Sequence, residues 1–115
     1  MKAGDLAIAD LPVLGGGLKR RPVVLLCEMP PFQDWLVCGV TTQLRHEVVG
    51  LDDIVRANDP DFPASGLKAE SLIRLGFVAT LSPAEIVAQI GALAPARHRQ
   101  LLSRLANHLI STPIP

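Results

Sequence analysis

Three groups of side chains in this sequence are of types that bind phosphate. Lys19-Arg20-Arg21 follows a glycine-rich loop, Thr41-Thr42-Gln43 follows an apolar segment, and Arg74 lies between two aliphatic residues. Arginine stays charged and offers a planar fork of donors to phosphate oxygens, and a threonine hydroxyl can donate one more hydrogen bond. Each group also has an ordinary interpretation: a solvated basic turn, β-forming threonines and an exposed strand arginine. His46 is interpreted as a surface residue near a strand end, with a catalytic role as the alternative.

The other ionisable residues do not predict a metal or cofactor site. His98 and His108 are ten residues apart, so they are not an i, i+4 pair on one helix face. Gly15-Gly16-Gly17 lacks the Gly-Lys-Ser/Thr ending and the following helix of a phosphate-binding loop. Four aspartates lack the glycine and the closing glutamate of a calcium-binding loop, so a solvated loop is expected. These aspartates are Asp52, Asp53, Asp59 and Asp61.

Composition narrows the functional classes. The 115 residues are 49% hydrophobic and 19% charged, which predicts one globular domain. Eleven basic residues balance eleven acidic ones, which argues against nucleic-acid coating through bulk positive charge. The absence of Tyr, with one Trp and three Phe, argues against an aromatic platform for several bases. No apolar stretch approaches the roughly 18 residues of a membrane span, and the start carries no signal segment. We therefore expect a cytoplasmic protein with Cys27 and Cys38 reduced, although a bond across a hairpin stays open.

Apolar segments separated by turn residues predict an antiparallel sheet. The run at 22–27 is typical of a strand buried on both faces, and it forms a hairpin with 35–42 around Pro30-Pro31. The acidic segment 52–66 contains two prolines and a glycine, which favours loop. The expected strands cover residues 5–10, 22–27, 35–42, 45–51, 71–75, 77–80 and 89–93.

Two helix starts follow the strands. Ser82-Pro83-Ala84-Glu85 carries a capping box and a proline at the first helical position, and it predicts a short helix. A final amphipathic helix is expected at 95–110, followed by a flexible tail at 111–115. The predicted architecture is one domain at 1–110, a small curled antiparallel sheet with a helix packed on it. The leucines that share one stripe of the final helix are Leu101, Leu102, Leu105 and Leu109.

Several short motifs, in order along residues 2–110, resemble the MazF/PemK toxin family. Each motif is weak alone, but their succession is fairly specific. They are Gly4-Asp5, Arg21-Pro22, Val40-Thr41-Thr42-Gln43, Gly66-Leu67-Lys68, Ser71-Leu72-Ile73-Arg74-Leu75, Ala79-Thr80-Leu81 and Ile90-Gly91-Ala92-Leu93.

The resemblance implies a mainly β fold, an SH3-like barrel of the CcdB/MazF/PemK type with a C-terminal amphipathic helix. It also implies a homodimeric toxin of a type II toxin–antitoxin system, whose antitoxin is acidic and partly disordered. Such toxins are metal-independent endoribonucleases that cut single-stranded RNA at short sequences. The ribose 2′-hydroxyl attacks the adjacent phosphate and leaves a 2′,3′-cyclic phosphate and a 5′-hydroxyl.

The same resemblance suggests site residues. Arg21 matches the family's catalytic arginine, Thr41 its catalytic hydroxyl, and Arg74 an arginine that serves as acid or phosphate clamp. The positively charged residues are expected to bind substrate or antitoxin. The polar groups beside Thr41 are expected to hydrogen-bond to the edge of a base. The substrate-binding candidates are Lys19, Arg20, Thr42, Gln43 and His46.

Two departures from the family pattern remove candidate proton carriers. The first loop, Gly15-Gly16-Gly17-Leu18, has no ionisable group, and Gly76 stands where some members have an aspartate. The sequence therefore predicts a reduced catalytic set, or alternatively a weak or inactive module that binds RNA or a partner on the same fold. A gyrase poison like the fold relative CcdB is disfavoured, because Thr112-Pro113-Ile114-Pro115 does not match the C-terminal residues that this action requires.

Overall fold

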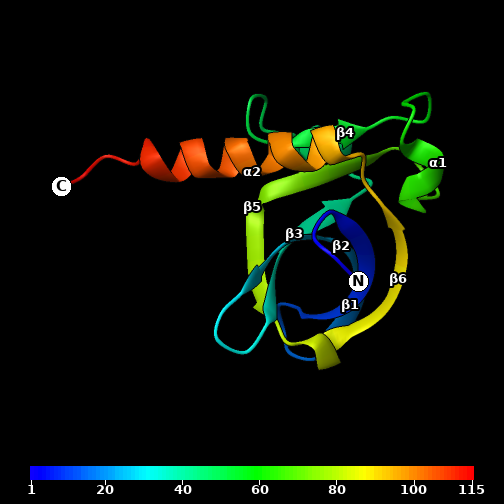
Figure 1. Cartoon of the computed structure of the whole chain (residues 1–115), viewed down its shortest axis with the longest axis horizontal. Helices are drawn as coiled ribbons and strands as arrows, with labels where there is room; N and C mark the ends of the chain where they lie inside the picture. Colours follow the sequence, from blue (N-terminus) through cyan, green and yellow to red (C-terminus); the bar gives the residue numbers. More distant parts are fainter.

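A curled antiparallel sheet of six strands forms the body of the protein (Figure 1). The structure is a computed structural model that describes all 115 residues. The strand order across the sheet is β4-β5-β3-β2-β1-β6. This curled sheet, with a helix after its last strand, confirms the predicted fold class. The strands are β1 (Asp5–Pro12), β2 (Leu18–Met29), β3 (Asp34–Thr41), β4 (Asp53–Val55), β5 (Ser71–Leu81) and β6 (Ile86–Ala92).

Four helical segments join or follow the strands. The closing helix α2 (Pro95–Ile110) has the predicted bounds. The short start at Ser82 is the 3-10 helix η2 (Pro83–Glu85), and its capping box is present, with the Ser82 amide donating to the Glu85 carboxylate at 3.0 Å. The other two are η1 (Leu44–His46) and α1 (Phe62–Ser65). None of these helices is long and apolar enough to span a membrane.

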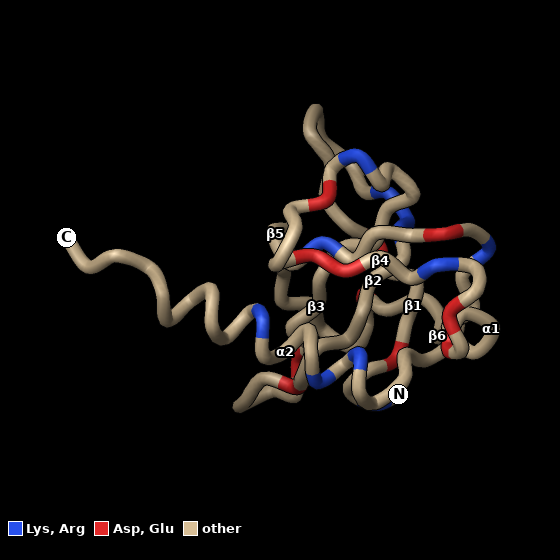
Figure 2. The backbone as a smooth tube through the Cα atoms, turned by 90° about the horizontal axis from the view of Figure 1, so that it is seen from above, with Lys and Arg blue, Asp and Glu red and all other residues tan.

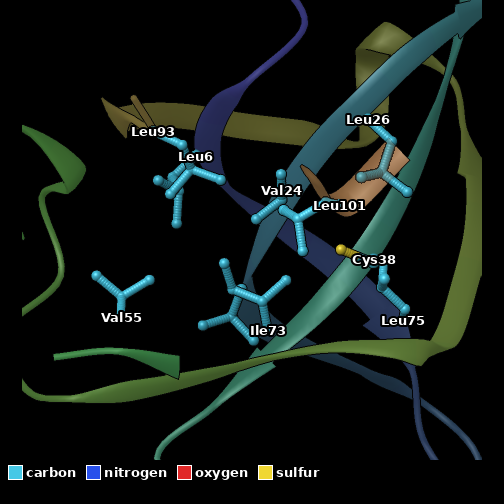
Figure 3. Close-up of a cluster of buried hydrophobic side chains, with 10 residues drawn as sticks. Leu6, Val24, Leu26, Cys38, Val55, Ile73, Leu75, Leu93 and Leu101 are labelled. Atoms are coloured by element: carbon cyan, nitrogen blue, oxygen red, sulfur yellow. The ribbon is translucent and has the colours of Figure 1, made fainter. Parts of the chain in front are cut away.

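Strand alternation divides the buried side chains between two cores. On β2, Val24 and Leu26 belong to the larger core, which also holds Leu101 of α2 (Figure 3). Val23 and Leu25, on the opposite face of β2, belong to the smaller core. Successive side chains of a strand point to opposite faces, so a continuous apolar run fills both. The prediction that 22–27 is buried on both faces is therefore confirmed.

Only the first part of the leucine stripe on α2 is buried. Leu101 is fully buried in the larger core, and Leu102 and Leu105 are partly buried against it. Leu109 is 63% exposed, because the C-terminal part of α2 extends beyond the sheet (Figure 1). The fold thus leaves an apolar helix end without an intramolecular partner.

The hairpin of β2 and β3 separates the two cysteines. Cys27 is paired with Leu36, and Cys38 is paired with Val24, so the thiols are not opposite each other. Both cysteines are free. Burial raises the pKa of the Cys38 thiol to about 12, so this side chain behaves as a small core residue.

The strand expected at 45–51 is wrong, and two short elements interrupt the loop expected at 52–66. Residues 45–51 form no strand but η1 and a turn, and Asp52 accepts a hydrogen bond from the amide of Val48 at 2.9 Å. Such local side-chain bonds compete with strand pairing. The segment 52–66 is more ordered than predicted, since it contains β4 and α1. Strand β4, and not 45–51, takes the free edge of β5.

The two strands expected at 71–75 and 77–80 are one bent strand, β5. Its pairing with β3 shifts abruptly: Cys38 lies opposite Val78, but the next residue, Gly39, lies opposite Arg74. The residues between them form a bulge, defined here as Leu75–Phe77. Asp52 is only 3% exposed and accepts a hydrogen bond from the amide of Leu75 at 3.0 Å, which anchors the bulge.

Two glycines let α1 pack against β6. Gly66 ends α1 with φ of +74°, and a Cβ added there would lie 1.9 Å from the carbonyl oxygen of Ile90. A Cβ at Gly91 would lie 2.3 Å from the carbonyl oxygen of Ala64. No other residue fits at this crossing without moving the backbone. The contact explains on physical grounds why two of the sequence motifs contain glycine.

Candidate functional site

Three adjacent strands bring the predicted catalytic side chains to one face of the sheet. Val23 of β2 lies opposite Gly39 of β3, which lies opposite Arg74 of β5. Two residues further along β2 and β3 in this register come Arg21 and Thr41. Paired residues share a face, and so do residues two apart on one strand. Arg21, Thr41 and Arg74 therefore project from the same face.

A cavity of about 430 Å³ opens on this face. Its lining contains five of the predicted site residues, from three strands and the segment after β3. The two basic residues in it are Arg21 and Arg74, and no aspartate, glutamate or histidine belongs to the lining. The predicted residues that line it are Arg21, Thr41, Thr42, Gln43 and Arg74.

Neither arginine of the cavity has an acidic partner. Arg21 and Arg74 are exposed and form no ion pair in the structure. Their guanidinium donors are therefore available to a ligand, and two such groups in one cavity favour an anion. This arrangement provides charge stabilisation but no obvious proton acceptor.

Local hydrogen bonds fix the conformation of the segment after β3. The Oγ1 of Thr41 accepts a hydrogen bond from the amide of Gln43 at 3.1 Å. This bond uses a lone pair of the hydroxyl and leaves its proton free to donate into the cavity. The carbonyl oxygen of the Gln43 side chain accepts from Arg45, which leaves the amide NH₂ free. Both groups therefore present donors to an anionic or base-edge acceptor.

The remaining three candidates lie outside the cavity lining. Arg20 forms an exposed ion pair with Asp10 at 3.2 Å, because alternation turns it away from the face that carries Arg21. Lys19 is exposed at the start of β2, and His46 is exposed at the end of η1. In Figure 2, basic and acidic residues are interspersed along the chain, so the charge of the cavity is a local property.

The lining residues that the sequence did not point to include Gly39, Ser71 and Phe77. The hydroxyl of Ser71 donates to the carbonyl of Ala69 at 2.8 Å, so its donor is already used. Phe77 is 37% exposed, and its ring lies against Gly39. A large aromatic residue in an exposed part of a strand was the available signal, but only the bulge of β5 shows where it lies.

Sequence reasoning also missed a second polar cluster, which we call the Arg97 cluster: Arg97, Asp53, Asp59 and Asp61. Its ion-pair distances are 2.7 Å to Asp53, 2.9 Å to Asp59 and 2.9 Å to Asp61. The expectation that the aspartates form a solvated loop is wrong, because three of them hold β4 and the loop that follows it against α2. The fourth, Asp52, anchors the bulge of β5.

The Arg97 cluster shifts the ionisation of its members. The hydrogen bond from Arg97 lowers the pKa of Asp61. The backbone amide of Arg56 contributes most to the lowered pKa of Asp59, and Arg97 adds to it. The pKa of Arg97 itself is raised, chiefly by its hydrogen bond to Asp61. Every donor direction of this guanidinium is satisfied within the protein, so the cluster is structural.

Comparison with known proteins bears on the fold. No protein-family model and no curated protein sequence matches the chain. Among solved structures, Mycobacterium tuberculosis toxin MazF-mt6 is similar, with a TM-score of 0.69 and 21% identity over 95% of this chain and 99% of that chain. The chain has the MazF-type fold. A second structure with a similar fold is an endoribonuclease in complex with its cognate antitoxin from mycobacterial species, with a TM-score of 0.65 and 17% identity over 100% of this chain and 99% of that chain.

Proposed function

We propose that this protein is the toxin of a type II toxin–antitoxin pair and a metal-independent endoribonuclease that cuts single-stranded RNA at specific short sequences. The observation that carries the proposal is the cavity in which Arg21 and Arg74 lie without acidic partners beside the hydroxyl of Thr41. The MazF-type fold supports it, since the two similar structures are described as a toxin and as an endoribonuclease with its antitoxin.

The proposed reaction is a transesterification within the RNA. The ribose 2′-oxygen forms a bond to the adjacent phosphorus and loses its proton, while the bond from phosphorus to the 5′-oxygen breaks and that oxygen gains a proton. Negative charge rises on the phosphoryl oxygens in the transition state. Arg21 and Arg74 stabilise that charge, and Thr41 donates one more hydrogen bond to it.

The lining supplies no carboxylate or imidazole to carry the protons. Charge stabilisation is therefore the main contribution of this chain, which fits the reduced catalytic set expected from the sequence. The same observation favours the second candidate function, a module that binds RNA or a partner in the cavity and cuts slowly or not at all.

Two partners belong to the proposal besides RNA. An acidic, partly disordered antitoxin segment would bind over the basic strand start, where Lys19 and Arg21 are exposed without acidic partners. A second copy of the chain would cover the apolar end of α2, where Leu109 is 63% and Ile110 is 82% exposed. Both interactions would take place in the cytoplasm.

A cleavage assay tests the proposal. The purified protein is incubated with a long single-stranded RNA in EDTA, beside Arg21→Ala, Thr41→Ala and the control Arg99→Ala, which removes an exposed arginine of α2 outside the cavity. We expect discrete fragments with 2′,3′-cyclic phosphate ends from the unmodified protein and from Arg99→Ala only. Binding of RNA without cleavage by the unmodified protein would instead establish the second candidate. Equal cleavage by all four proteins would contradict the assigned residues.

A further inference from the structure

Phe77 stands apart from the other aromatic residues of the chain. Trp35 is 5% exposed in the smaller core, Phe62 packs against the larger core, and Phe32 is 80% exposed after the end of β2. Phe77 alone contributes an aromatic ring to the cavity of Arg21 and Arg74. It is 37% exposed there, so part of an apolar ring is available among polar and cationic groups.

The bulge of β5 places the ring of Phe77 at the cavity. With regular pairing, β5 would continue past Arg74 without a break, but three residues, Leu75–Phe77, are inserted opposite the step from Gly39 to Cys38. Leu75 is 3% exposed in the larger core, and its amide is held by Asp52. The bulge is therefore fixed at its first residue, and the chain returns to the cavity at Phe77.

The ring of Phe77 packs over Gly39, which has no side chain. A Cβ at Gly39 would lie 3.1 Å from Cδ1 of Phe77, which is tighter than an ordinary contact. The ring occupies the space that a side chain on β3 would take. Because Gly39 also lies opposite Arg74, the ring is supported next to the arginine of the same cavity.

An aromatic surface beside unpaired arginines is suited to a nucleotide. The guanidinium groups bind phosphate oxygens, and every nucleobase has a π-face that stacks on an aromatic ring whatever its hydrogen-bonding edge. We infer that Phe77 is a stacking platform for one unpaired base of the RNA, next to the phosphate bound by Arg21 and Arg74. This inference rests on the proposed function and adds a binding residue to it.

The stacking platform has a consequence for specificity. Stacking is tolerant of sequence, so Phe77 contributes affinity at its position whichever base occupies it. Recognition of particular bases belongs to the free donors of the segment after β3, such as the amide of Gln43. The two contributions are therefore separable by substitution.

Binding to a short single-stranded oligonucleotide with 2′-deoxy sugars, which cannot be cut, tests the inference. Dissociation constants are measured for the unmodified protein, Phe77→Leu, Phe77→Trp and Phe32→Leu, an aromatic substitution outside the cavity. Truncating a base-stacking aromatic residue typically weakens binding by about 5- to 150-fold. We expect a loss in that range for Phe77→Leu, unchanged binding for Phe32→Leu, and retained binding for Phe77→Trp. Thermal melting checks that each variant is folded.

A spectroscopic readout separates stacking from a structural role. In Phe77→Trp, we expect the indole fluorescence to be quenched when the oligonucleotide binds, and less so with an abasic site at the contacted position. Trp35 is buried in the smaller core, so the change belongs to position 77. Unchanged affinity of folded Phe77→Leu, or no quenching in a Phe77→Trp variant that binds, would overturn the inference and leave the proposed function standing. Failure of the unmodified protein to bind or cut RNA would overturn both.

Discussion

The guanidinium of Arg97 is surrounded by three carboxylates, whereas those of Arg21 and Arg74 line a cavity that has no acidic residue. The three side chains are chemically the same. In the Arg97 cluster each donor already has a partner, so the arginine contributes to stability. In the cavity the donors have none, so the arginines can bind a ligand. The role of each arginine is therefore set by its neighbours in the fold and not by its residue type.

Replacing Arg21 should have the largest effect on activity and little on folding. Arg21→Ala removes a donor that acts on the charged transition state, and the expected loss of cleavage rate is about 100- to 1000-fold. Because Arg21 is exposed and unpaired, the thermal midpoint should stay close to that of the unmodified protein. Cleavage kinetics and a melting curve measured on the same sample check both parts. A large drop in the midpoint would mean that Arg21 has a structural role, as Arg97 does.

Replacing Arg97 should show the opposite pattern. Arg97→Ala leaves partly buried carboxylates without their cation, and the free energy of unfolding should fall by about 3 kcal/mol. Urea unfolding measures it, and Arg99→Ala, on the exposed side of the same helix, is the matched control. If the folded variant kept its stability, the Arg97 cluster would be incidental.

Asp52→Asn should lower both the stability of the fold and the affinity of the cavity for RNA. The carboxylate accepts amide hydrogen bonds from Val48 and Leu75 on separate oxygens, whereas an amide side chain has only one oxygen. One buried amide should therefore lose its partner, at about 1–3 kcal/mol of stability. Because the bulge of β5 follows Arg74 directly and contains Phe77, RNA affinity should weaken as well. Unfolding and binding measured together would show whether the anchor serves the cavity, and a loss of stability alone would restrict Asp52 to folding.

Acid should destabilise the Arg97 cluster selectively. Asp61 and Asp59 have folded-state pKa values below their ordinary value of 3.8, so the unfolded chain binds protons more readily. Their stabilisation is complete above 3.8 and is lost as the pH falls through the lower folded pKa values. The free energy of unfolding should decline in that range and decline less steeply in Asp61→Asn. Urea titrations across acidic pH test this, and parallel curves for the two proteins would contradict it.

Arg20→Ala should have the smallest effect. Its ion pair with Asp10 is exposed, with 68% of the arginine side chain accessible, so the change in unfolding free energy should be under about 1 kcal/mol. The variant should also cut RNA nearly as well as the unmodified protein, because Arg20 lies outside the cavity lining. A rate loss as large as that of Arg21→Ala would extend the binding surface beyond the cavity and blur the distinction between neighbouring arginines.

Local pattern was sufficient for much of the fold. The apolar run 22–27, the hairpin around Pro30-Pro31 and the helix at 95–110 all follow from periodicity, turn residues and helix starts. The prediction of a strand at 45–51 is wrong. Val48 and Val49 have strand propensity, but the polar residues around them form local hydrogen bonds instead of pairing with a strand. Five of the eight predicted site residues line one cavity, because strand alternation and cross-strand pairing can be anticipated once the strands are known.

Neighbours along the chain are enough to predict the hairpin of β2 and β3, the closing helix and the residue types able to hold phosphate. Which arginine is free and which is satisfied depends on tertiary contacts, because the partners of Arg97 lie 36 to 44 residues away in the sequence. The place of Phe77 also depends on such contacts, because the bulge of β5 requires the packing of Leu75 and the hydrogen bond to Asp52. Contacts between distant segments are set when both cores fill, and no local pattern encodes that outcome.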